Sequence, residues 1–212
     1  AEVKYRRVAL TLGMKNRGSI LLDPNLSSGD VVWSGNSRGI PEIRVGLVDF
    51  TDIPFCNGWV QVNAALAYGK FTDKDWVWHH SSLQKDRINP TSLWNYKYLL
   101  FQTKPSKPFS FLFGIQSTVL FGGTTYAYTN GKLILEQKNK VNLSTLFKTL
   151  VPTAGDSEGN YVPGDHKGAW TGALRYRFSN GATVRGYFEW FFEDGSGLVK
   201  NNGWDGLWGL EY

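Results

Sequence analysis

Hydrophobic and polar residues alternate strictly along several stretches of the chain. From Val60 to Tyr68 one set of alternate positions is apolar, and the other is small or polar. The same alternation fills residues 170–178 and resumes over 182–190 after the turn 179–181, which contains an Asn-Gly step. Successive side chains of a strand point to opposite faces, so this pattern predicts strands with one apolar face. The Asn-Gly step predicts a tight hairpin between the last two, because both residues tolerate positive φ.

The pattern predicts eight strands, each near the roughly 9 to 11 residues that a tilted strand needs to cross a bilayer. They cover residues 3–14, 41–50, 60–68, 93–103, 109–121, 170–178, 182–190 and 204–212. The connections are alternately long (15–40, 70–92, 122–168 and 193–203) and short (51–57, 104–108 and 179–181). Outer-membrane barrels combine short periplasmic turns with long extracellular loops. The sequence therefore predicts an all-β fold: an antiparallel transmembrane β-barrel, or a segment of a larger one.

Charged side chains fall on the inward positions of two neighbouring predicted strands. These lumen-facing residues are Arg175, Arg177, Arg185 and Glu189. An apolar core rarely buries charges unless they are paired, whereas a wet or plugged lumen accommodates them. The apolar faces end in aromatic residues, as the girdles of a membrane barrel do; examples are Tyr96, Tyr98, Phe188 and Trp190. A soluble β-sandwich or lipocalin-like barrel, whose strands also alternate, is the alternative fold.

Composition narrows the function classes. The 9 Trp, 10 Tyr, 13 Phe and 24 Gly favour strands and turns, and no window has the roughly 18 apolar residues of a spanning helix. The net charge of +5 is spread along the chain, so nucleic acid is not an expected partner. The single cysteine, Cys56, cannot form an internal disulfide, and no Cys/His spacing resembles a metal site. The N-terminus lacks a signal-peptide pattern, so we expect a processed chain or an excised segment.

Motifs for catalysis are absent. The sequence contains no phosphate loop, dinucleotide fingerprint, nucleophile elbow or metal-binding helix motif, so we expect neither cofactor nor metal. His79 and His80 lie near Ser81 and Ser82, which leaves a barrel-embedded lipid hydrolase as an alternative. Proximity in sequence does not provide the geometry between base and nucleophile that catalysis needs. We therefore expect the protein not to be an enzyme.

The connection 122–168 is predicted to be a long extracellular loop with a short helix. Leu143, Leu146, Phe147 and Leu150 recur at helical spacing, Asn142 can cap the start, and Pro152 ends the run. Such a helix either packs on the rim of the barrel or serves in gating or partner binding. The remainder of the connection is predicted to be surface loop because it is rich in small and polar residues, namely Gly155, Asp156, Ser157, Gly159, Asn160 and Gly164.

Aromatic and planar polar residues gather in two of the long connections. The candidates are Trp33, Asn36, Arg38, Trp76, Trp78, His79 and His80. Flat aromatic faces flanked by polar groups suit sugar rings, whose C–H faces stack while their hydroxyls form hydrogen bonds. These residues are therefore predicted to bind glycan. For any single tryptophan, a place in the aromatic girdle or packing between loops is an open alternative.

Several stretches resemble the Wzi-like capsule assembly family, in particular its Bacteroidetes branch. The main match is Asp30–Gly46 (DVVWSGNSRGIPEIRVG), which looks like the signature of that family. Further matches are NGWVQ at 57–61, YGKFTD at 68–73, YKYLLFQTKPS at 96–106, and FEDGSG at 192–197 leading to NGWDGLW at 202–208. The resemblance spans almost the whole chain.

The resemblance implies a Gram-negative outer-membrane barrel that associates with capsular or surface polysaccharide and helps to assemble or anchor it. Members of the family are larger than 212 residues and carry a helical plug, so residues 1–212 are expected to be a single domain that covers part of a longer barrel. Expected partners are surface polysaccharide, outer-membrane lipids and other envelope proteins. A porin with a basic lumen is the first alternative, since Arg175, Arg177 and Arg185 would form an anion-favouring wall.

Overall fold

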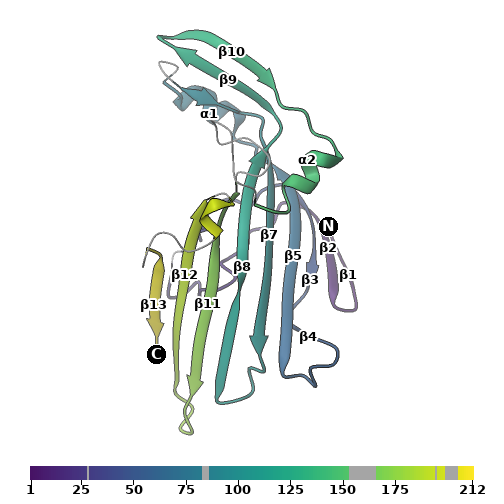
Figure 1. The fold of residues 1–212 in the computed structure, drawn as a ribbon, viewed down its shortest axis with the longest axis vertical. Helices are drawn as coiled ribbons and strands as arrows, with labels where there is room; N and C mark the ends of the chain where they lie inside the picture. Colours follow the sequence, from purple (N-terminus) through teal and green to yellow (C-terminus); the bar gives the residue numbers. More distant parts are fainter. Residues whose placement is uncertain (28, 83–85, 153–165, 194, 199–204) are drawn as a thin grey trace.

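The computed structural model describes residues 1–27, 29–82, 86–152, 166–193, 195–198 and 205–212. The chain is a mostly antiparallel β-sheet protein with 52% strand and 8% helix. The expected all-β class and antiparallel pairing are thereby confirmed. A tall, curved sheet forms the body of the molecule, and a smaller sheet lies beyond its upper end (Figure 1).

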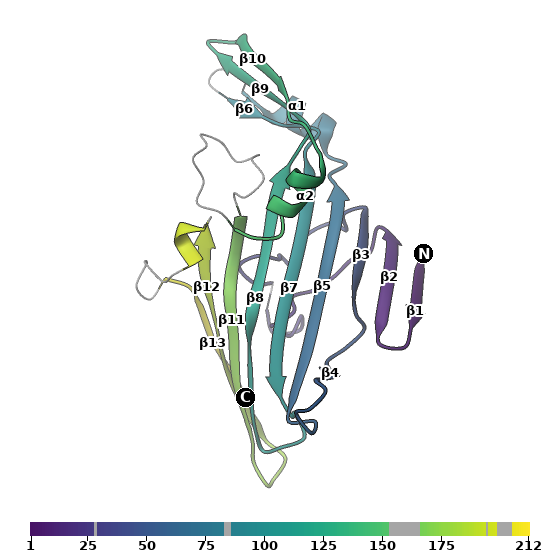
Figure 2. The ribbon, with the colours of Figure 1, turned by 45° about the vertical axis from the view of Figure 1, so that its right-hand side comes forward.

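The tall sheet has ten strands, and five of them have 11 to 13 residues. They are β1 (Glu2–Tyr5), β2 (Val8–Gly13), β3 (Glu42–Leu47), β4 (Thr51–Asp52), β5 (Val60–Lys70), β7 (Leu93–Thr103), β8 (Phe109–Phe121), β11 (His166–Arg177), β12 (Thr183–Glu193) and β13 (Leu207–Glu211). Their order is β1-β2-β3-β5-β7-β8-β11-β12-β13, with β4 paired to β5. Within the described residues, β1 and β13 are therefore the two edges of this sheet (Figure 2).

One face of the tall sheet is apolar and exposed; we call it the outer face. Cross-strand pairing aligns Leu10 with Val45, Val45 with Leu66, and Leu99 with Ile115, so apolar side chains share one side of the sheet. Val45 is 46% exposed and Leu99 is 40% exposed. Nothing in the described protein covers much of this apolar surface. Near its upper end a polar pair interrupts it, where Lys97 Nζ donates to Asn95 Oδ1 at 2.9 Å.

The opposite face, the inner face, is covered by the chain itself. Residues 14–41, here called the inner segment, connect β2 to β3 and pass behind the sheet in the view of Figure 2. Trp33 packs against Trp94 and Tyr96, with ring centroids 5.6 and 5.2 Å apart. Leu21 and Leu22 form a second buried cluster with side chains of the opposite half of the sheet. The expectation that residues 15–40 form an extended external loop is therefore wrong.

A smaller, three-stranded sheet lies beyond the upper end of the tall sheet. It has the order β10-β9-β6 and consists of β6 (Arg87–Ile88), β9 (Thr124–Thr129) and β10 (Lys132–Lys138). Helix α1 (Lys74–His80) lies against it (Figure 1). The sequence pattern predicted only loop in these places. Parts of the long connections 70–92 and 122–168 thus form regular secondary structure. We call α1 and the three-stranded sheet the upper module.

Helix α2 (Leu143–Lys148) confirms the helix expected within 122–168. Asn142 caps it, because its side chain accepts from the backbone N–H of Thr145 while the Thr145 hydroxyl accepts from the Asn142 N–H. The helix lies over the upper ends of β5, β7 and β8 on the outer face (Figure 2). There the Tyr68 hydroxyl donates to the Leu146 carbonyl at 3.2 Å. The helix thus packs against the upper end of the tall sheet, and a role in gating or partner binding stays a prediction.

Two further expectations need correction, and two others lie beyond the described residues. Residues 3–14 form a hairpin rather than one strand, because Arg6 adopts a left-handed conformation (φ 54°) and reverses the chain. Tyr96 and Tyr98 lie on the inner face, so they are not part of an outer aromatic girdle. The glycine-rich run 155–164 and the start of the last strand at residue 204 fall outside the described residues. Over the part of the chain that is described, no helix has the length and apolar character needed to span a membrane.

Candidate functional site

A pocket of about 480 Å³ lies between the entry to β3 and the start of α1; we call it the rim pocket. Two connections that are far apart in sequence form it, with Arg38 and Ser37 from the inner segment's end and Phe71, Asp73, Asp75 and Trp76 from the residues after β5. Neighbouring strands β3 and β5 bring these connections together, since Glu42 pairs with Gly69. The structure thus unites two of the predicted glycan-binding positions, Arg38 and Trp76, in one pocket.

Helix α1 determines how the aromatic side chains of this region are presented. Trp76 stacks on His80 one turn later, with ring centroids 4.4 Å apart and an interplanar angle of 16°. The stacked pair is exposed, Trp76 to 61%. The His80 ring is also fixed by Nδ1, which lies 2.9 Å from the Trp76 carbonyl oxygen. A broad aromatic surface therefore stands at the mouth of the rim pocket, held in place by its own helix.

Trp78 has a different role from Trp76. Its ring packs against Tyr126 of β9, with centroids 5.0 Å apart, and it is only partly exposed. Trp78 therefore attaches α1 to the small sheet, which is packing between connections as the alternative interpretation held. His79 is exposed, and its Nδ1 lies 2.6 Å from the Asp75 carbonyl oxygen.

Trp33 is the candidate whose surroundings differ most from the expectation. It is only 7% exposed, and its indole N–H donates to the Arg17 carbonyl at 2.8 Å. The expectation that it lies on an exposed loop surface is wrong, because the inner segment carries it into the sheet's aromatic cluster. Asn36 and Arg38, a few residues later, are exposed. Asn36 lies next to the rim pocket in sequence but does not line it.

Among the predicted lumen-facing charges, Glu189 is the most deeply buried. Its side chain accepts three hydrogen bonds: from Val31 N at 2.7 Å, from Gln116 Nε2 at 2.7 Å and from Thr171 Oγ1 at 2.9 Å. The residue has no exposed area. A carboxylate is tolerated in such a place only when its oxygens are satisfied by donors. Glu189 therefore ties the inner segment to the wall of the sheet.

The predicted arginines lie lower on the same half of the sheet. Arg175 and Arg185 are direct cross-strand partners, and both side chains find acceptors. Arg185 Nη1 bonds Glu211 Oε2 at 2.8 Å and its Nη2 donates to the Leu21 carbonyl, while Arg175 donates to the Pro105 carbonyl. Arg177, at the end of β11, is exposed. Like charges directly opposite each other are unfavourable in a strand pair, so this arrangement suits a polar surrounding.

Contacts around α1 do not favour a hydrolase. His79, His80 and Ser81 are each bonded to a backbone carbonyl of the same helix, at Asp75, Trp76 and Val77 respectively. A catalytic pair instead needs a histidine within hydrogen-bond reach of a nucleophile. Among the described residues, no three side chains of His, Cys, Asp or Glu gather as metal ligands would.

Sequence reasoning missed the cations at the contact between the inner segment and β3. Arg17 bonds Glu42 Oε1 at 2.9 Å, and Arg44 bonds the same oxygen at 2.8 Å. The signal was present in β3, where Glu42 and Arg44 alternate with Ile43 and Val45. Arg17 itself lies in an irregular segment, where no period in the sequence indicates which way a side chain points.

Comparisons with protein-family models, with curated proteins and with solved structures each returned no match.

Proposed function

We propose that this chain forms part of the wall of an outer-membrane β-barrel that associates with capsular or other surface polysaccharide. The main support for a membrane location is that the usual pattern of burial, apolar inside and polar outside, is reversed. Apolar Leu12, Ile43 and Leu174 are 59%, 58% and 48% exposed on the outer face, whereas polar Gln116 and Glu189 are fully buried on the inner face. A wall that separates hydrocarbon from a polar interior needs this distribution.

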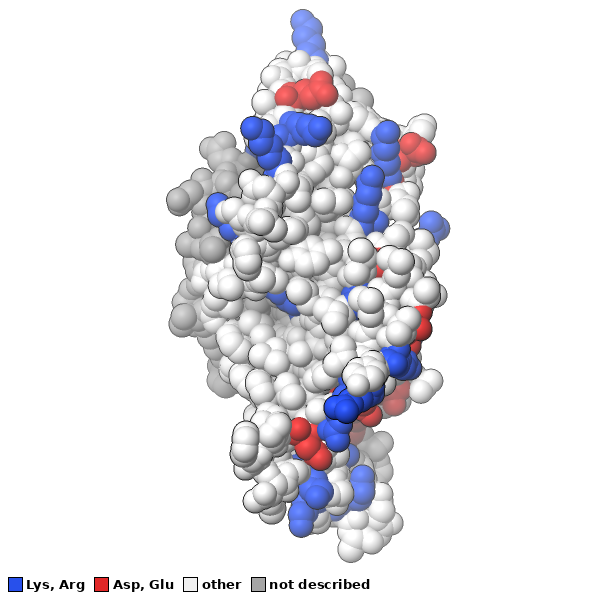
Figure 3. All heavy atoms as spheres, turned by 90° about the vertical axis from the view of Figure 1, so that its right-hand side faces the viewer, with Lys and Arg blue, Asp and Glu red and all other residues white. Residues whose placement is uncertain are grey.

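The distribution of charge supports the same proposal. Figure 3 shows an area of mostly uncharged side chains over the middle of one side of the molecule, with Lys, Arg, Asp and Glu at its upper and lower ends and along one margin. Charged residues within the hydrocarbon region of a barrel are destabilising on the lipid side, so an uncharged band between charged ends is expected. The edge strands β1 and β13 are where we propose that further strands pair to continue the wall.

The rim pocket is the proposed contact with polysaccharide. It lies at the end of the tall sheet that carries the long connections, the end predicted to be extracellular. Trp76 offers an exposed aromatic face, and Arg38, Asp73 and Asp75 offer charged hydrogen-bonding groups around the same space. This combination suits a sugar residue, which presents C–H faces to an aromatic ring and hydroxyls to polar groups. Trp33 and Trp78 do not line this pocket, so they are not part of this contact.

Polysaccharide retention tests the rim pocket directly. The double substitution Trp76→Ala with Arg38→Gln should release surface polysaccharide from cells that make the protein, and it should abolish binding on a glycan array. Trp59→Ala is the matched control: Trp59 is 59% exposed, against 61% for Trp76, but precedes β5 at the opposite end of the sheet. Retention that is unchanged in the double variant would refute the assignment of the rim pocket.

A diffusion channel is the second candidate, favoured by the arginines on the inner face. The inner segment lies across that face and is tied to it by Glu189, which opposes free passage. Conductance in planar bilayers separates the two functions. A polysaccharide anchor should be electrically silent, whereas a porin should show steady single-channel steps that favour anions.

A further inference from the structure

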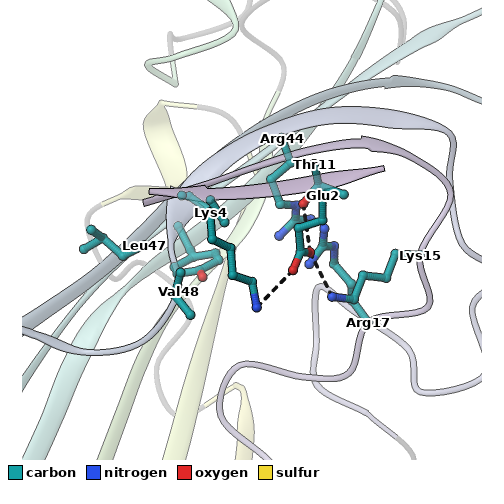
Figure 4. Close-up of a pocket in the computed structure, with 12 residues that line it drawn as sticks. Glu2, Lys4, Thr11, Lys15, Arg17, Arg44, Leu47 and Val48 are labelled. Carbon is teal, nitrogen blue, oxygen red and sulfur yellow. Dashed lines mark hydrogen bonds and ion pairs between the residues drawn. The ribbon is translucent and has the colours of Figure 1, made fainter. Parts of the chain in front are cut away.

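A cluster of cations occupies the inner face near the β1 edge, and it shares no residue with the rim pocket. Its side chains come from β1, from β3 and from the start of the inner segment. The cations are Lys4, Lys15, Arg17 and Arg44. Figure 4 shows their charged groups converging on one space around Glu2. The polysaccharide contact proposed above uses none of these residues.

Positive charge exceeds negative charge in this cluster. Glu2 is shared by two lysines, at 3.1 Å from Lys4 and 3.0 Å from Lys15. Glu42 is likewise shared by two arginines, at 2.9 Å from Arg17 and 2.8 Å from Arg44. The cluster of four cations and two carboxylates therefore keeps two positive charges that these carboxylates do not balance. An anion that entered the space would restore neutrality.

Arg17 also carries an unused donor. Its Nη2 is buried and has no hydrogen-bond partner among the described residues, although its Nε is paired with Glu42. A buried donor without an acceptor is destabilising, and a guanidinium group has five N–H donors to satisfy. The neighbouring Arg44 uses Nε and Nη2 on Glu42, at 2.8 and 3.3 Å. Nη2 of Arg17 is thus a donor from which a ligand oxygen would accept a hydrogen bond.

Space for a ligand adjoins these groups. One cavity of about 130 Å³ lies among the four cations, and a second of about 290 Å³ shares Lys15, Arg17, Arg44 and Tyr98 with it. Trp33 and Tyr96 also line the second cavity. A water molecule takes about 30 Å³ of liquid volume, so the first cavity has room for a carboxylate or phosphate group and the second for a sugar ring. The first cavity is therefore suited to bind an anionic group, and the second provides aromatic side chains beside it.

We propose that this cluster binds a sugar acid, with the carboxylate held by Arg17, Arg44 and Lys15 and the ring against Trp33 and the neighbouring tyrosines. Arginine is suited to the carboxylate because its parallel N–H groups match the two oxygens. Among the aromatic side chains that line the second cavity, Tyr98 is partly exposed and can give the ring an apolar contact, whereas Trp33 and Tyr96 are 7% and 3% exposed and complete the lining. The inference extends the proposed polysaccharide association by assigning an acidic class of sugar, and it concerns a site separate from the rim pocket.

Calorimetric titration of the full chain in detergent micelles at low ionic strength tests the proposal. The probes are sodium glucuronate, glucose and inorganic phosphate. We expect glucuronate to bind, glucose not to bind, and phosphate to bind more weakly than glucuronate. Arg17→Gln and Lys15→Gln should each weaken glucuronate binding by about tenfold, the size expected for one charge-assisted hydrogen bond. Arg177→Gln and Lys132→Gln, which remove the same charges at exposed positions on β11 and β10, should have no effect.

Three outcomes would overturn the proposal. They are no binding of glucuronate by the unsubstituted chain, equal binding of glucose and glucuronate, and equal binding of phosphate and glucuronate, which would leave the ring without a role. Lys15→Gln keeps the test valid if Arg17→Gln does not fold. The Lys15 side chain is 52% exposed, and its substitution leaves the Arg17–Glu42 pair intact. Polysaccharide retention by the Trp76 and Arg38 variant is measured separately, so failure of one proposal is distinguishable from failure of the other.

Discussion

The two faces of the tall sheet are built from the same strands but are adapted to opposite surroundings. On β7, Leu99 projects outward and is 40% exposed, whereas Tyr96 projects inward and is 3% exposed. On β12, Glu189 is buried and bonded, while Phe188 on the other face packs with Trp190 and Trp208. The buried Glu189 carboxylate is hydrogen-bonded on the inner side, and apolar side chains such as Leu99 are left exposed on the outer side. The comparison teaches that polar side chains are kept on the inner face and apolar side chains on the outer face. A charge added to the outer face should therefore destabilise the protein, and so should the removal of a charge from the inner face.

The strongest way to break the comparison is to place a charge on the outer face. Leu99→Arg should reduce the free energy of unfolding by about 2–4 kcal/mol in lipid vesicles, the cost of a basic side chain at mid-bilayer depth on the lipid face of a barrel. Denaturant titration with a gel-shift assay for the folded form measures this. Ile134→Arg is the control, since Ile134 is 65% exposed on β10 of the upper module. Equal stability changes in the two variants would contradict a lipid-facing outer surface.

On the inner face, the corresponding change is removal of a buried charge. Glu189→Ala leaves Val31 N and the Gln116 and Thr171 side chains without their acceptor, so we expect a loss of about 1–3 kcal/mol. The inner segment should then become accessible to protease, and bilayer conductance should appear. Glu193→Ala is the control: Glu193 lies on β12 like Glu189, but it is half-exposed and pairs with Lys167. This substitution should change neither protease accessibility nor conductance. An inner segment that stays protected in Glu189→Ala would show that the carboxylate does not hold it.

The smallest expected effect concerns the place where α2 shields the outer face. Asn142→Ala removes the cap of this helix and should cost about 1 kcal/mol. The loss should be local, so amide hydrogen exchange of residues 143–148 should accelerate while exchange in β5 stays slow. Asn36→Ala, at an exposed position, provides the control. Uniformly faster exchange throughout the tall sheet would mean that α2 stabilises the whole wall.

Alternation predicted the tall sheet well because each strand of the wall faces two different environments. The ranges 93–103 and 109–121 match β7 and β8 at both ends. The β9–β10 hairpin escaped prediction because Leu133, Ile134 and Leu135 are three apolar residues in succession, and the pairing shifts its register there. Helix α1 escaped because it is seven residues long and has no side-chain cap at Asp73. In both places the local sequence lacks the period on which the prediction depends.

The candidate site was predictable only in part. Strand parity placed Glu189 inward, and the sequence drew attention to Arg38 and Trp76, which the structure joins in the rim pocket. The burial of Trp33 depends on Trp94, more than sixty residues later, and no local signal reports such a contact. The same limit applies to Arg17, whose neighbours come from three different parts of the fold.

The hydrogen bond between Val31 and Glu189 joins positions 158 residues apart. Contacts of such long sequence separation form late, because the loop entropy must be overcome before they add stability. We therefore expect the wall to assemble first, with an open interior, and the inner segment to dock only once β12 is in place. During that interval the inner face would be open, and the kinetics of closure would be set by the last strands to be added.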